Sequence, residues 1–189
     1  GESIPVSYEP QIAVFGCGGW GRNIVRTLAG LGALRAVVDP SEAGRGQAAE
    51  IAPGVSAAAD PAEVLADEQV RGVMIATPAE THYTMARAAL EAGKDVFVEK
   101  PLTIDVGEAR DLVRRAEAAD RLLMVGHLLE YHPAILRLHE LIESGELGEV
   151  RYLISNRLNL GKIRTEENAL WSFAPHDIAV ILRLVGDLP

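Results

Sequence analysis

The sequence has little of what several protein classes need. Its single cysteine, Cys17, excludes a disulfide framework and indicates a reducing compartment. No apolar run approaches the length of a membrane-spanning helix, and no signal peptide is visible. Lys and Arg number 18 against 27 Asp and Glu, and the net charge of −9 argues against nucleic acid or an anionic membrane as a partner. These features predict a soluble, cytoplasmic protein.

A glycine-rich loop directly follows the first predicted strand, residues 11–15. Gly16, Gly18 and Gly21 have the GxGxxG spacing of dinucleotide sites: the first permits a tight turn, the second lets backbone approach a pyrophosphate, and the third allows close helix packing. The N-terminus of the helix that follows favours an anion. The residues of this loop predicted to bind the cofactor are Gly16, Gly18, Gly19, Trp20 and Gly21.

Asp39 directly follows the second predicted strand, residues 34–38. An acidic side chain at this place can accept hydrogen bonds from the adenosine ribose, so Asp39 favours NAD over NADP. Two alternatives stay open. Asp39 could simply start a turn with the two residues that follow it, and Arg45, a little further on, could accept the 2′-phosphate of NADP.

Strands and helices continue to alternate as far as residue 125. The further predicted strands are 72–76, 95–98 and 122–125, and the longer predicted helices are 81–92 and 105–120. Right-handed crossovers between such units give a doubly wound parallel sheet. The predicted fold class is therefore α/β, with a Rossmann domain over residues 1–126.

The remaining residues, 127–189, predict a truncated second α/β domain with an open sheet. A helix is expected over 133–144, and the alternating residues 150–158 predict a strand with one apolar face. A chain of 189 residues suffices for about one and a half domains. In the full-length protein, the second-domain sheet is expected to form a homo-oligomer.

Glu99, Lys100 and Pro101 follow the predicted strand 95–98. Ligands of open parallel sheets bind beyond the carboxyl ends of the strands, so Lys100 is expected beside the nicotinamide. There it could take the hydroxyl proton of an alcohol whose hydride goes to the cofactor. A free lysine has a pKa of about 10.4, which desolvation or the charged nicotinamide would have to lower. Glu99 opposes this and is expected to face away from the hydroxyl, and the alternative for Lys100 is a solvated strand end.

Five motifs together resemble the Gfo/Idh/MocA oxidoreductase family. They are Gly16–Gly21, Ala76–Pro78 with His82, Glu99–Pro101, Gly126 with Tyr131–Pro133, and His176–Asp177. The resemblance implies that Lys100 contacts the substrate hydroxyl and relays its proton, that His176 completes the site from the second domain, and that the Lys100–Pro101 bond is cis. It also implies further cofactor contacts from Thr77, Pro78, His82, Glu99 and Lys100. His82 could alternatively be a surface residue.

The chain departs from the family pattern at two positions. Ser172 stands where many members carry an aspartate four residues before the histidine, so most of the acid/base work is assigned to Lys100. Glu130 stands where members often have arginine, and no role for it follows from the sequence.

The second half predicts the substrate class. Amides and cations gather ahead of Trp171 and His176, a mixture suited to sugar hydroxyls and a diphosphate. The segment resembles the nucleotide-sugar branch of the family, whose members oxidise UDP-N-acetylglucosamine or its uronate at C3. The predicted substrate-binding residues are Lys100, His127, Asn156, Arg157, Lys162, Arg164, Trp171 and His176. The alternatives are a solvated loop for the cations and core packing for Trp171.

The predicted function is NAD-dependent hydride transfer from a secondary hydroxyl of a nucleotide sugar. A dehydrogenase of a free sugar or inositol and a catalytically silent NAD sensor are the alternatives, and retention of Lys100 with His176 opposes the sensor. A short-chain dehydrogenase is excluded, because no tyrosine precedes a lysine by four residues. No metal site is predicted, since the chain has one cysteine and no close cluster of histidine and carboxylate residues.

Overall fold

The computed structural model describes residues 9–156 and 169–186. The chain divides into two compact units, residues 1–126 and 127–189. Each unit is described by itself below. Across the described ranges, no helix combines the length and the apolar composition needed to cross a membrane.

The first unit is built on a six-stranded sheet in the order β3-β2-β1-β4-β5-β6, and every pairing is parallel. The strands are β1 (Ile12–Phe15), β2 (Leu34–Val38), β3 (Ser56–Ala58), β4 (Gly72–Ile75), β5 (Asp95–Val98) and β6 (Leu123–Val125). The predicted doubly wound parallel sheet is confirmed. The strand order reverses between β1 and β4, which places a ligand crevice beyond their carboxyl ends.

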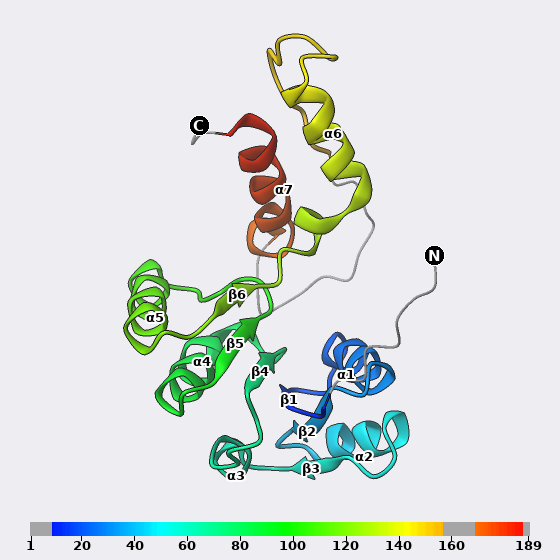
Figure 1. The fold of residues 1–189 in the computed structure, drawn as a ribbon, viewed down its shortest axis with the longest axis vertical. Coiled ribbons are helices and arrows are strands. Elements are labelled where there is room, and N and C mark those ends of the chain that lie inside the picture. Colours follow the sequence, from blue (N-terminus) through cyan, green and yellow to red (C-terminus); the bar gives the residue numbers. More distant parts are fainter. Residues whose placement is uncertain (1–8, 157–168, 187–189) are drawn as a thin grey trace. The chain divides into compact units, whose positions relative to one another are not determined.

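Helices cover both faces of this sheet (Figure 1). They are α1 (Gly21–Gly30), α2 (Glu42–Ile51), α3 (Pro61–Leu65), α4 (His82–Glu91) and α5 (Val106–Ala119), with a short 3₁₀ turn η1 (Ala79–Thr81) before α4. Successive strand residues point to opposite faces, so Val14 belongs to the core cluster that includes Val25 of α1, while Phe15 belongs to the other cluster, which includes Leu112 of α5. Burial on both faces explains why the strands are almost wholly apolar.

The helix starts depend on local side-chain caps. Asp105 accepts a hydrogen bond from the Glu108 amide at 3.0 Å, and Ser41 accepts one from the Gly44 amide at the start of α2 at 3.0 Å. Asp60 caps α3 in the same way, with Pro61 as the first helical residue. The strand β3 was not among the predicted strands, because its Ser-Ala-Ala sequence carries no apolar signal.

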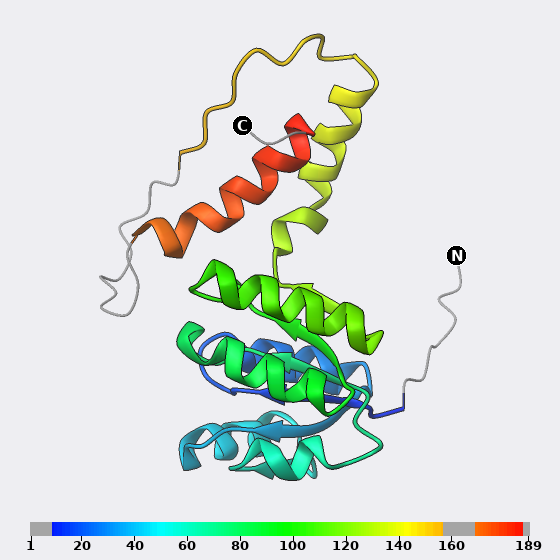
Figure 2. The ribbon, with the colours of Figure 1, turned by 90° about the vertical axis from the view of Figure 1, so that its left-hand side faces the viewer.

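The regular elements of the second unit are all helical in the residues that the structure describes. It comprises the 3₁₀ turn η2 (Leu128–Tyr131), α6 (Pro133–Glu143) and α7 (Ala169–Val185), and α6 packs against α7 (Figure 2). The predicted strand 150–158 is wrong over residues 150–156, which form no strand; residues 157–158 lie outside the described ranges. The described part of the unit supplies no partner strand, and Tyr152 and Ile154 are 79% and 74% exposed. The open sheet is therefore not found there, and assembly through it stays a prediction.

Candidate active site

The glycine loop between β1 and α1 has a shape that its glycines impose. Gly16 has a φ of 90°, and a Cβ built there would lie 2.8 Å from the Ala76 carbonyl oxygen. A Cβ on Gly21 would lie 1.9 Å from the Gly16 carbonyl oxygen. By contrast, a Cβ on Gly18 or Gly19 would meet no atom of the described residues within 4 Å, apart from its chain neighbours. The chain's own packing therefore requires the first and last glycines, whereas the middle ones leave open backbone for a ligand's phosphates.

Asp39 ties the end of β2 to this loop. Its side chain is 8% exposed, and its carboxylate accepts hydrogen bonds from the Cys17 amide at 2.9 Å and from the amide and hydroxyl of Ser41 at 2.9 and 2.6 Å. Gly44 leaves room for this carboxylate, because a Cβ there would lie 2.2 Å from Asp39 Cγ. Burial opposes ionisation, but these bonds and Arg45 outweigh it and lower the pKa of Asp39.

The sequence leaves two alternatives open for this region: a turn that starts at Asp39, and an Arg45 that accepts the 2′-phosphate of NADP. Asp39 does start a turn, through the bond from the Ser41 amide. Arg45 donates from Nη1 to the carbonyl oxygens of Asp39 and Pro40, each at 2.9 Å, so its guanidinium lies against the backbone that follows β2.

The Cys17 side chain is fully buried in the same loop. Burial raises the pKa of its thiol, and the negative charge of the Asp39 carboxylate raises it further.

The predicted site residues that follow β4 lie in the turn leading into α4. The Thr77 hydroxyl accepts a hydrogen bond from the Thr81 hydroxyl at 2.7 Å. His82 is 1% exposed, so the alternative of a surface residue is wrong. Its Nδ1 lies 2.7 Å from the Pro101 carbonyl oxygen and its Nε2 lies 2.9 Å from the Thr77 carbonyl oxygen. The ring nitrogens, through which a histidine would contact a cofactor, therefore face backbone.

Glu99 connects the segment after β5 to the glycine loop. Its Oε1 accepts a hydrogen bond from the indole Nε1 of Trp20 at 2.7 Å. Gly126, after β6, leaves space for this side chain, since a Cβ there would lie 3.0 Å from Glu99 Oε2. Lys100 follows directly, and the bond from Lys100 to Pro101 is cis, as the family resemblance implied. Residues 79 positions apart thus meet at the carboxyl edge of the sheet.

Two acidic residues of the second unit, Asp177 and Glu130, make contacts that sequence reasoning did not find. His176 lies in α7 directly after Pro175, and the next residue, Asp177, accepts a hydrogen bond from the Ser155 hydroxyl at 2.9 Å. Glu130 accepts one from Arg183 Nε at 2.6 Å, which ties η2 to α7 and gives this residue the role that the sequence left open.

The other predicted residues of this unit differ in exposure. His127 is half-buried, whereas Asn156 and Trp171 are exposed, so core packing of Trp171 is wrong in the described structure. Arg157, Lys162 and Arg164 lie outside the described residues. No group of three or more histidine, cysteine or acidic residues that could hold a metal is found in the part of the chain that the structure describes.

The parallel sheet with its switch point, the open middle of the glycine loop and the acidic residue after β2 define a dinucleotide-binding Rossmann domain. Residues 11–127 match the family described as "Oxidoreductase family, NAD-binding Rossmann fold", known as Gfo/Idh/MocA. The chain belongs to this family, and its first unit is an NAD-binding domain.

Similar proteins differ in what they act on. Inositol 2-dehydrogenase of Mycolicibacterium smegmatis is 40% identical over 143 residues, which cover 74% of this chain and 41% of that protein. UDP-N-acetylglucosamine 3-dehydrogenase of Acidithiobacillus ferrooxidans is 32% identical over 180 residues, covering 95% and 55%. The structure of GenD2 from gentamicin A biosynthesis, in complex with NAD, has a TM-score of 0.81 at 28% identity, covering 97% of this chain and 55% of its own. The chain spans about half the length of these relatives.

Proposed function

We propose that the protein is an NAD-dependent dehydrogenase that oxidises a secondary hydroxyl of a sugar or cyclitol, with Lys100 as the proton relay. The observation that carries this proposal is the hydrogen bond of 2.7 Å from Trp20 in the glycine loop to Glu99. It joins the cofactor-binding loop to the residue that directly precedes Lys100. Lys100 thus belongs to the carboxyl edge of the sheet, where a Rossmann domain binds its dinucleotide.

The site residues of the first unit have separate roles in this proposal. The amides of Gly18 and Gly19 bind the pyrophosphate, and the space beside the two residues supports this, because a Cβ on either would meet no described atom within 4 Å other than its chain neighbours. Asp39 Oδ2 accepts one hydrogen bond from the described residues, which leaves a lone pair for a ribose hydroxyl. When bound, NAD would supply the nicotinamide ring that accepts the hydride. Lys100 takes the hydroxyl proton, and His176 assists from the second unit.

For the substrate we propose a nucleotide sugar oxidised at C3. The support is the similarity to UDP-N-acetylglucosamine 3-dehydrogenase along 95% of the chain, together with the cations Arg157, Lys162 and Arg164, which suit a diphosphate. Inositol is the second candidate, because the relative that is 40% identical acts on it. A homo-oligomer is proposed for the whole protein.

The test supplies the protein and NAD with either UDP-N-acetylglucosamine or myo-inositol. We expect reduced nicotinamide to accumulate with the nucleotide sugar, and mass spectrometry to detect a product two hydrogens lighter. The mass measurement detects the product even where reduced cofactor stays bound to the protein and does not accumulate in solution. Turnover of inositol alone would replace the substrate proposal, and NAD binding without any product would favour the sensor.

A further inference from the structure

His82 is a buried polar side chain that the proposed mechanism does not use. At 1% exposure it is among the largest fully buried side chains of the chain. Burying an imidazole in a protein interior is costly unless its nitrogens find partners. Both have partners here: the Pro101 carbonyl oxygen lies 2.7 Å from Nδ1 and the Thr77 carbonyl oxygen lies 2.9 Å from Nε2.

The two partners restrict what the ring can do. A carbonyl oxygen only accepts hydrogen bonds, so each contact requires an N–H on the histidine ring. A neutral imidazole has one N–H and fills one of the two bonds, whereas a ring with both N–H groups fills both. Either ring nitrogen would have to give up a backbone partner before it could bind a ligand.

The two carbonyl groups belong to the two segments that flank the site. Thr77 follows β4 and starts the turn before α4, and Pro101 is the neighbour of Lys100 beyond β5. Because β4 and β5 are paired in the sheet, both segments leave it side by side. His82, at the first position of α4, is hydrogen-bonded to both.

We propose that His82 is a positioning residue whose two hydrogen bonds, called here its Nδ1 arm and its Nε2 arm, have separable effects. Its Nδ1 arm fixes the Lys100–Pro101 segment and thereby the amine, and its Nε2 arm fixes the Thr77–Pro78 turn against the cofactor. The inference rests on the proposed function, since it assigns to Lys100 a reacting position. It gives His82 an indirect role in place of the direct cofactor contact that the family resemblance implied.

Two conservative variants separate the arms. The amide nitrogen of asparagine reaches about as far as Nδ1, and that of glutamine about as far as Nε2. His82→Gln therefore loses the arm to Pro101, and we expect kcat to fall about 100-fold with the NAD dissociation constant within about twofold. His82→Asn keeps that arm, and we expect kcat to change less than about threefold while NAD binds about tenfold more weakly. His139→Gln, in the second unit, is the matched control and should change neither value.

A second readout needs no substrate. NAD should protect Lys100 from reductive methylation, measured by peptide mass spectrometry, in the wild type and His82→Asn but not in His82→Gln. If the three proteins show this protection pattern but the wild type gives no turnover, the proposed function fails and the positioning role stands. Equal losses in both variants, or a wild-type Lys100 that NAD does not protect, would overturn the positioning role.

A measurement on the wild type covers the case in which both variants unfold. The two arms require a proton on each ring nitrogen, which NMR of protein labelled with ¹⁵N-histidine detects directly. We expect both protons to exchange slowly with solvent, as a buried N–H does. A ring protonated at only one of the two nitrogens would overturn the two-arm assignment.

Discussion

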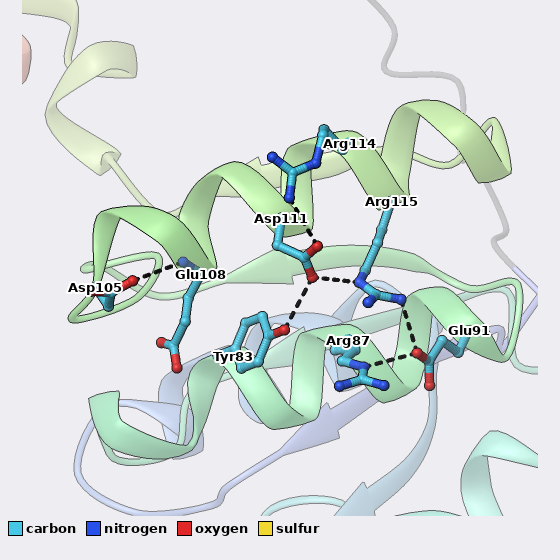
Figure 3. A network of polar contacts seen from close by, with 8 residues as sticks. All are labelled: Tyr83, Arg87, Glu91, Asp105, Glu108, Asp111, Arg114 and Arg115. Atoms are coloured by element: carbon cyan, nitrogen blue, oxygen red, sulfur yellow. Dashed lines mark hydrogen bonds and ion pairs between the residues drawn. The ribbon is translucent and has the colours of Figure 1, made fainter.

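The carboxyl edge of the sheet and the outer face of α4 and α5 use polar side chains differently. At the edge, Asp39 and His82 are buried and bind mainly backbone groups of neighbouring loops. On the outer face, charged side chains bind one another across two helices (Figure 3). Contacts to backbone set the course of a loop, whereas exposed contacts between side chains add modest stability.

The outer network is continuous. It joins Tyr83, Arg87 and Glu91 of α4 to Asp111, Arg114 and Arg115 of α5 (Figure 3). Arg115 donates to Asp111 on its own helix and to Glu91 on α4, and the Tyr83 hydroxyl donates to Asp111 at 3.0 Å. The hydrogen bond from Arg115 is the main cause of the lowered pKa of Asp111. The comparison predicts that edge substitutions change binding and chemistry, and that outer-face substitutions change only stability.

The largest effect is expected for Lys100→Met. Removing the amine should lower kcat by about a thousandfold, because the hydroxyl proton loses its acceptor, while NAD still binds. Lys100→Arg is the control that keeps the charge, and it should be similarly slow because guanidinium stays protonated. Steady-state kinetics and NAD calorimetry measure the two quantities. Loss of NAD binding together with turnover would instead assign the lysine a structural role.

A pair of alanine variants tests the glycine loop. Gly21→Ala places a Cβ against the Gly16 carbonyl oxygen, and we expect it to cost about 1–3 kcal/mol of stability and to abolish NAD binding. The added methyl group of Gly18→Ala has open space within 4 Å among the described residues, so the stability should stay within about 0.5 kcal/mol of the wild type. Its NAD affinity should nevertheless fall at least about tenfold, since the methyl group stands where the pyrophosphate approaches. Unchanged NAD affinity in Gly18→Ala would contradict the assigned site.

Asp39→Asn tests how much the buried carboxylate contributes to stability and how that contribution depends on pH. The amide places an N–H against a backbone N–H of Cys17 or Ser41, which should cost about 1–3 kcal/mol. Because the folded pKa of Asp39 lies below its unfolded value, its stabilisation is present above the unfolded value of about 3.9 and is lost as the pH falls through the folded value. Urea unfolding between neutral and acidic pH should therefore show a shallower acid loss in the variant. An identical acid loss in both proteins would contradict this.

The smallest effect is expected for Asp111→Asn on the outer face. We expect a small decrease in the midpoint of thermal unfolding, with NAD affinity and turnover unchanged. The contribution of Asp111 is present above its unfolded pKa and is lost as the pH falls through its lowered folded pKa. High salt should narrow the difference from the wild type. A change in NAD affinity would break the distinction between the two regions.

The prediction from sequence succeeded where the signal is local. Apolar runs with short spacers predicted the parallel sheet, and the spacing of Gly16, Gly18 and Gly21 predicted a loop that the structure explains by close approach and open space. It failed for residues 150–156, because alternation indicates which face of a strand would be apolar but not whether a partner strand lies beside it.

By itself, the sequence determined the Rossmann architecture and the presence of a dinucleotide loop, since the repeat of apolar residues and the sterics of glycine act within a few positions. Only the tertiary structure decided that Trp20 meets Glu99, that His82 is buried between two carbonyl groups and that Glu130 binds Arg183. These partners lie 79, 19, 5 and 53 residues apart. Which of them meet depends on strand order and on how the loops pack, and no periodicity of the chain encodes that.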